Sequence, residues 1–259
     1  MGHQHLLVLP RSKVWKQVVG LISGGANAEA IAGAVSEAAE CSMIDASNDV
    51  GVQHAFWLLT QLPLAARGNE FSKQLTELGV KVGPDPTLIE ITSAFMSAID
   101  RHVELSRARS DFGEMAQLSA IEAIHVVVAR ELPGLFGVTG GEVKSAIAGL
   151  ATVKQFAVLS REFFSRLTRR HLDYYLSREL SAHVGSDQRF TSLRDHAAFN
   201  DAITLHCAET SRIIKEFSGE WYSKQNYEGG IDPSKAGRFV NVAAKKIRAE
   251  LRRRRGLDA

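Results

Sequence analysis

The sequence predicts an all-α protein, an array or bundle of about eight to ten helices with at most one short N-terminal strand. Three observations support this prediction. Apolar residues recur three and four positions apart through most of the 259 residues, which is the period of a helix with one buried face. Proline and glycine stand mainly between these periodic segments. Leu6–Leu9 is a short run with strand character, but no second run offers it a partner.

Three helices are expected in the first quarter of the chain. Apolar residues spaced along Val14–Ile22 predict the first, and the glycine pair that follows is a helix stop. Asn27 is the expected N-cap of the second, whose small alanines favour close approach of a neighbouring helix. Asn48 or Asp49 opens the third, which we expect to end near Pro63.

Three further helices are expected before the proline at position 133, each with a signal at one end. Gly79 ends the first of them, and Asp85 and Pro86 are the expected cap and first residue of the second. Asp111 is the expected cap of the third. The predicted ranges are 69–78, 86–110 and 111–131.

The chain is expected to form a single helical domain over 1–259, with one candidate sub-boundary near 133–141. Pro133 and Gly134 break the preceding helix there, and we expect a loop that includes Gly140 and Gly141. Beyond this point the predicted helices cover 142–181, as one or two helices, then 195–220, and a last helix that opens at Asp232 and Pro233.

Composition and the N-terminus predict a cytoplasmic protein that does not associate with membranes. The 45% apolar and 23% charged residues are average for globular proteins. No apolar run approaches the roughly 20 residues of a membrane span, and Leu6–Leu9 is too short for a secretory signal. Cys41 and Cys207 cannot build a disulfide framework, so we expect reduced, buried thiols. Abundant alanine and a preference for arginine over lysine are typical of a GC-rich bacterial genome.

Familiar catalytic signatures are absent from the sequence, which favours a non-enzymatic protein without a cofactor. There is no phosphate loop, no Gly-x-Ser-x-Gly elbow and no His-Glu-x-x-His. The alternative is a helical metalloenzyme with a carboxylate and histidine di-metal site. Two pairs at helical spacing, Glu122 with His125 and His206 with Glu209, could supply four ligands. The same spacing also suits an amphipathic helix whose histidine is satisfied in the core.

A basic stretch with interleaved aromatic residues lies within the predicted 142–181 helix. Arg166, Arg169 and Arg170 are expected to share the helix face opposite Phe163 and Leu167. Such a face can bind single-stranded nucleic acid through charge and stacking. We favour a solvated helix face over ligand binding, because Glu162 and Asp173 dilute its charge.

The C-terminal segment carries the least ordinary charge distribution. From residue 235 onward there are nine basic and two acidic residues, a net charge of +7, while the rest of the chain has 22 basic and 27 acidic residues, a net charge of −5. Apolar residues at helical spacing predict that the helix in 232–259 docks on the body: Val240, Ala243, Ala244, Ile247 and Leu251. Its basic residues are Lys245, Lys246, Arg248, Arg252, Arg253, Arg254 and Arg255.

Four consecutive arginines exceed what complementing a helix dipole requires, since each cation contributes about 0.3–1 kcal/mol at best. Three interpretations stay open: contact with nucleic-acid phosphates, contact with an acidic protein surface, or a solvated helix end. The acidic surface could belong to a partner, to a second copy or to the body itself. The sequence thus predicts a helical interaction protein, a subunit or adaptor of a larger assembly, with a protein partner and with nucleic acid and homo-oligomers as further candidates.

Overall fold

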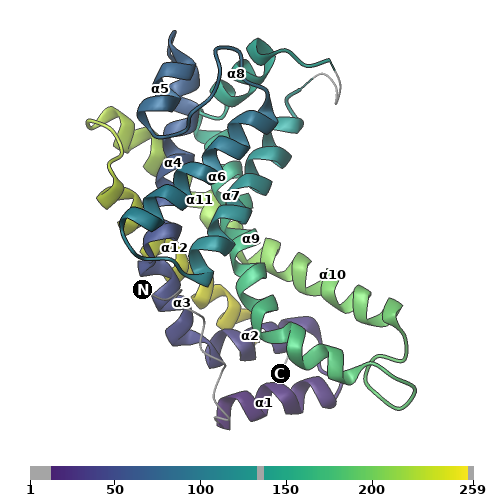
Figure 1. Ribbon diagram of the computed structural model, residues 1–259. Coiled ribbons are helices and arrows are strands. Elements are labelled where there is room, and N and C mark those ends of the chain that lie inside the picture. Colours follow the sequence, from purple (N-terminus) through teal and green to yellow (C-terminus); the bar gives the residue numbers. More distant parts are fainter. Residues whose placement is uncertain (1–12, 133–136, 256–259) are drawn as a thin grey trace.

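The computed structural model describes residues 13–132 and 137–255, and over these ranges the fold is all-α, as predicted (Figure 1). The described part has no strand, although Val184 and Phe190 form an isolated bridge, and it has more helices than expected. The α-helices are α1 Lys13–Ser23, α2 Ala28–Ala38, α3 Glu40–Asn48, α4 Val50–Arg67, α5 Phe71–Glu77, α6 Leu88–Leu105, α7 Asp111–Ala129, α8 Gly140–Gly149, α9 Val153–Leu180, α10 Leu193–Thr210, α11 Arg212–Tyr227 and α12 Pro233–Arg255.

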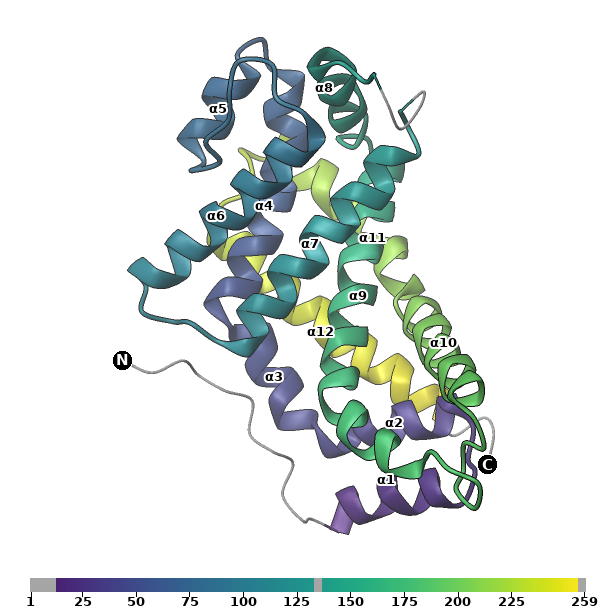
Figure 2. The ribbon, with the colours of Figure 1, turned by 45° about the vertical axis from the view of Figure 1, so that its right-hand side comes forward.

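Two long helices, α4 and α9, organise the bundle. α4 packs against α6, α7, α8 and α12, whereas α9 packs against α7, α10 and α11. α5 and α8 lie at one end of the molecule, and α1 and α2 lie at the other (Figures 1 and 2). α12 runs along α4 and then along α2 and α3, so its basic end lies at the α1 and α2 end of the molecule.

Aromatic rings fill the junction where α4, α9, α11 and α12 meet. The Phe56 ring on α4 stacks on Phe239 of α12, with centroids 5.0 Å apart. Phe156 of α9 stacks on Tyr222 of α11 at 3.7 Å. Aromatic pairs of this kind add about 0.5–1.5 kcal/mol beyond the burial of their area. This junction therefore holds the first half of α12 firmly on the body.

α7 is the one described helix that is long and apolar enough to cross a membrane by length and composition alone, although no span was expected from the sequence. Half of its apolar window is buried, and α7 packs against α4, α6 and α9. A core helix passes the same length and composition test, so this finding is weak evidence for a membrane span.

Several predicted helix boundaries are wrong because tertiary packing overrides local signals. α4 continues through Pro63 to Arg67, since Pro63 and the residues around it are buried in the core. Thr87, and not Asp85, caps α6: its hydroxyl accepts a hydrogen bond from the Glu90 N–H, while the Glu90 carboxylate accepts from the Thr87 N–H. Ser110, and not Asp111, caps α7. α3 was not predicted, because its pattern buries only Met43 and Ser47.

The predicted break near 133–141 does not separate two cores. Gly140 and Gly141 lie inside α8, which Thr139 caps, rather than in a loop. α4 packs against both α8 and α12, so helices from before and after this segment share one hydrophobic core. Residues 133–136, like the strand expected at Leu6–Leu9, lie outside the described residues.

The single helix predicted over 195–220 is two helices, α10 and α11, with Ser211 between them. The buried Thr210 hydroxyl donates to the backbone carbonyls of His206 (3.0 Å) and Cys207 (3.1 Å). A side chain that binds its own helix backbone in this way favours a bend. The break changes the direction of the chain, so that α11 packs along α9. Gly219 of α11 lies so close to Val153 of α9 that a Cβ at this position would sit 2.1 Å from the Val153 carbonyl oxygen.

Candidate nucleic-acid interface

α12 lies on the body through its apolar stripe and presents its basic residues on the other side. Val240, Ala243, Ile247 and Leu251 are buried, and Ala244 is half-buried. Asp232 begins the helix, because its carboxylate accepts the Lys235 N–H at 2.7 Å. The apolar stripe and the cap together fix how the helix is rotated, and this rotation decides which basic side chains reach solvent.

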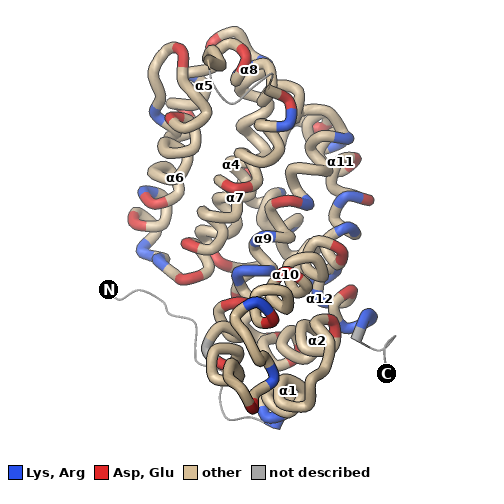
Figure 3. The backbone as a smooth tube through the Cα atoms, turned by 90° about the vertical axis from the view of Figure 1, so that its right-hand side faces the viewer, with Lys and Arg blue, Asp and Glu red and all other residues tan. Residues whose placement is uncertain are grey.

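The last turns of α12 form what we call the C-terminal basic surface, which comprises Lys245, Lys246, Arg248, Arg252, Arg253 and Arg254 (Figure 3). Lys245 and Lys246 are exposed, and the side chains of Arg252 and Arg253 are 48% and 61% exposed. Arg248 is the most covered member at 16%. The predicted seventh residue, Arg255, ends the helix, but its side chain lies outside the described part.

Two glutamates neutralise part of this surface. Glu40 of α3 pairs with Arg248 at 3.2 Å and with Arg252 at 2.6 Å. Glu250 of α12 itself pairs with Arg253 at 2.8 Å and lies 4.0 Å from Arg254. Among the described residues, no ion pair involves Lys245 or Lys246. Six cations thus share two carboxylates, which leaves an excess of positive charge on an accessible face.

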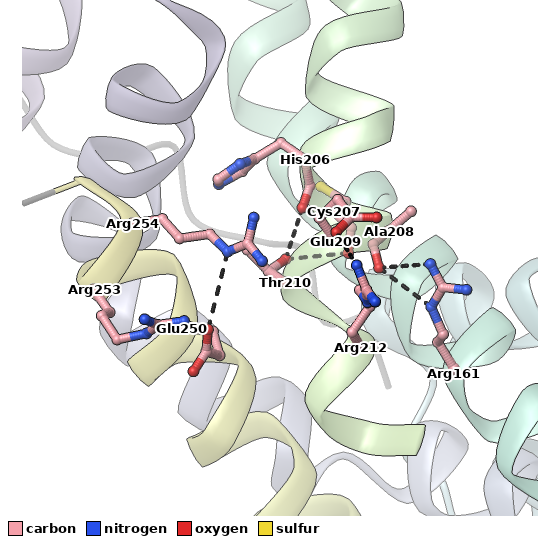
Figure 4. A network of polar contacts seen from close by, with 10 residues as sticks. All are labelled: Arg161, His206, Cys207, Ala208, Glu209, Thr210, Arg212, Glu250, Arg253 and Arg254. Atoms are coloured by element: carbon pink, nitrogen blue, oxygen red, sulfur yellow. Dashed lines mark hydrogen bonds and ion pairs between the residues drawn. The ribbon is translucent and has the colours of Figure 1, made fainter. Parts of the chain in front are cut away.

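The positive charge continues onto neighbouring helices at the C-terminal end of α10 (Figure 4). Arg161 of α9 donates to the Ala208 carbonyl at 3.0 and 3.3 Å, and Arg212 of α11 pairs with Glu209 at 3.0 Å. Figure 4 shows Arg254 extending from α12 toward this same helix end. Arginines near a helix C-terminus complement its negative dipole end. The hydrogen bond from Arg212 lowers the pKa of Glu209, as do the charges of Arg254 and Arg161.

A cation–π contact holds one lysine in place at the α11 boundary. The Lys246 ammonium lies 5.2 Å from the centroid of the Phe217 ring. The sequence did not indicate that Phe217, Arg161, Arg212 or Glu40 would border this surface. Their positions depend on how α3, α9 and α11 pack around α12, and no local pattern encodes that.

The second predicted basic face, on α9, is not a free surface, so this prediction needs correction. Arg166 pairs with Glu162 and with Glu122, and Arg170 pairs with Glu122 as well. Arg169 pairs with Asp173 and donates to the Thr204 hydroxyl of α10 at 2.9 Å. The three side chains are only 16–25% exposed. They lie between helices, where carboxylates of α7 and α9 neutralise their charge.

The structure does not bring the four predicted metal ligands together. Glu122 faces Arg166 and Arg170, and His125 forms a hydrogen bond with Thr92 at 3.1 Å. Glu209 pairs with Arg212, and His206 is buried in α10 on the other side of α9 from α7 (Figure 2). Within 13–132 and 137–255 no three His, Cys, Asp or Glu side chains are grouped to hold a metal ion. The di-metal interpretation is therefore not carried forward.

The two cysteines differ in their surroundings. Cys207 is buried, as predicted, and burial raises the pKa of its thiol to about 12, which keeps it protonated. Cys41 is exposed, so the expectation of burial was wrong there. It lies on the outer side of α3, next to Glu40.

Comparisons with known proteins add no relative. No protein-family model matches the chain, no curated protein is significantly similar to it, and no solved structure matches its fold significantly. The candidate interface therefore depends on the geometry of α12 and its neighbours alone.

Proposed function

We propose that this protein is a non-enzymatic helical interaction protein that binds nucleic-acid phosphates through the C-terminal basic surface. The observation that supports this proposal is the excess of six cations over two carboxylates on the accessible side of a firmly docked helix. Phosphate contacts require cations that are held in place but not neutralised, and they position a protein on the nucleic-acid backbone.

Nucleic acid suits this surface better than an acidic protein does. Protein interfaces usually centre on a buried aromatic or large apolar anchor. In the described part of α12, Val242 is the exposed large apolar residue, and it precedes the basic turns. A surface that offers charge without an apolar anchor is typical of contact with a phosphate backbone. As a subunit or adaptor, the protein would tether an assembly to nucleic acid through α12.

Fluorescence anisotropy with labelled duplex and single-stranded DNA and RNA tests the proposal. We expect binding that is tight at low salt and weakens steeply as salt rises, with little dependence on sequence. The double variant Lys245→Ala/Arg253→Ala should weaken binding and reduce the slope of log K against log salt by about two, one for each lost phosphate contact.

A charge-matched control is available at the opposite end of the molecule. Lys73→Ala/Lys81→Ala removes the same net charge near α5 and should leave both affinity and slope close to wild type. Equal losses in the two double variants would show that only overall charge matters, and no binding at low salt would refute the proposal. Binding of an acidic protein, but of no nucleic acid, by the same residues would replace it with the protein-partner interpretation.

A further inference from the structure

A small cavity lies beneath α12, on the side of the helix that faces the body. Five helices meet there, α3, α4, α7, α9 and α12, and the cavity, which is partly open to the surface, has a volume of about 40 Å³. Its walls are mostly apolar and include Met43, Val52, Phe112, Phe164, Val240 and Ile247. Room for one water-sized sphere takes at least about 10–15 Å³, so this cavity has space for about three or four non-hydrogen atoms.

His171 brings a buried imidazole to the lining of the cavity, which also includes the hydroxyl-bearing residues Ser47 and Thr168. The residue is 3% exposed and lines the cavity, and its ring stacks on Phe112 with centroids 5.9 Å apart. Its Nε2 lies 2.9 Å from the Ser42 hydroxyl oxygen. Its other ring nitrogen, Nδ1, is buried and has no hydrogen-bond partner among the described residues. Buried polar groups are nearly always paired, so an orphaned one requires an explanation.

The hydrogen bonds on the Nε2 side bear on whether Nδ1 carries a proton. The Tyr175 hydroxyl donates to the Ser42 oxygen at 2.8 Å, and we assign the Ser42 proton to the contact with Nε2, the tautomer that continues this hydrogen-bond chain. An imidazole that accepts at Nε2 carries its hydrogen on Nδ1. Burial also lowers the pKa of His171 to about 4, so the ring is neutral at physiological pH. In this tautomer Nδ1–H is a buried donor that has no acceptor within residues 13–132 and 137–255.

We infer that this cavity binds a small, mostly apolar molecule with one hydrogen-bond acceptor, such as a short-chain ketone or alcohol. Its oxygen would accept from Nδ1–H of His171, and its carbons would contact the apolar walls. The inference concerns the buried side of α12 and is independent of the nucleic-acid proposal.

Acetone, with four non-hydrogen atoms, is a suitable probe. The ring nitrogens of His171 can be followed by NMR in ¹⁵N-labelled full-length protein during an acetone titration. We expect a change in the Nδ1 signal that saturates, with a Kd no tighter than roughly tens of micromolar for so small a ligand.

Two leucine substitutions on α12 make the test specific. Ala244→Leu fills the cavity but retains His171, and should abolish the saturable change, whereas Ala249→Leu on the exposed face should leave it intact. A response that rises linearly without saturation, or that is the same in Ala244→Leu and wild type, would overturn the inference. A wild-type circular-dichroism spectrum and an unchanged midpoint of unfolding for Ala244→Leu would show that the helix is still docked.

Discussion

Two basic runs in this protein look alike in sequence and differ in structure. The α9 run consists of Arg166, Arg169, Arg170 and His171, and the α12 run consists of Arg252, Arg253 and Arg254. The arginines of the α9 run are 16–25% exposed and pair with acids on α7 and α9. Those of the α12 run are 30–61% exposed and share two glutamates with Arg248.

The difference shows that the supply of nearby carboxylates, rather than the number of arginines, decides what a basic run can do. A guanidinium held between helices by an acid is part of the structure, since removing its partner leaves a poorly hydrated charge. A guanidinium at a helix end can exchange a weak surface pair for a phosphate. Three predictions test this contrast, from the largest expected effect to the smallest.

Lowering the pH should lower the free energy of unfolding, because His171 of the α9 run is buried. Burial lowers the pKa of His171 to about 4, against about 6.5 in an unfolded chain. Between these values the unfolded state binds a proton that the folded state does not, so stability falls as pH falls. The contribution of His171 is about 1.4 kcal/mol per pH unit at most, and it is absent above pH 6.5.

Urea unfolding at several pH values measures this effect, and His171→Gln should flatten the curve between pH 6.5 and 4. His54 acts in the same direction, since burial and the nearby His102 lower its pKa to about 3. The contribution of His171 is therefore the difference between the pH slopes of wild type and His171→Gln, since both proteins retain His54. Equal pH slopes for the two proteins would contradict the prediction.

Removing an acid from the α9 run should cost moderate stability. Glu162 is 17% exposed and pairs with Arg166 and, at 3.7 Å, with Arg130. Glu162→Gln keeps the shape but removes the charge, and we expect a loss of about 1–2 kcal/mol in the free energy of unfolding. Denaturant titration at neutral pH checks this value. An unchanged midpoint of denaturant unfolding would mean that the α9 ion pairs stabilise the protein no more than exposed ion pairs do.

The same change in the α12 run should have the smallest effect on stability. Glu250→Gln removes the partner of Arg253, whose side chain is 61% exposed, so we expect a change below about 0.5 kcal/mol. Because the variant frees two arginines, it should bind nucleic acid about two- to fivefold more tightly at low salt. Anisotropy titrations measure this gain. Weaker binding than wild type would mean that Glu250 orients the arginines rather than competing for them.

The prediction of an all-α fold succeeded because helical periodicity is a local property that a single segment displays by itself. The Asn27 cap of α2, the Asp232 start of α12 and its buried stripe are local in the same sense. The helix end predicted near Pro63 was wrong for the opposite reason. Burial of the residues around the proline outweighs its tendency to break a helix. The cavity beside His171 left no sequence signal, because its walls come from five helices.

By itself, the sequence determined that the chain is helical and that positive charge gathers on its last helix. Only the tertiary structure decided which of the arginines have a carboxylate of another helix beside them, because these inter-helix partners lie far away along the chain. Arg248 and Glu40 are 208 positions apart, and Arg170 and Glu122 are 48 positions apart. Electrostatic pairing depends on distance in space, and packing alone sets that distance.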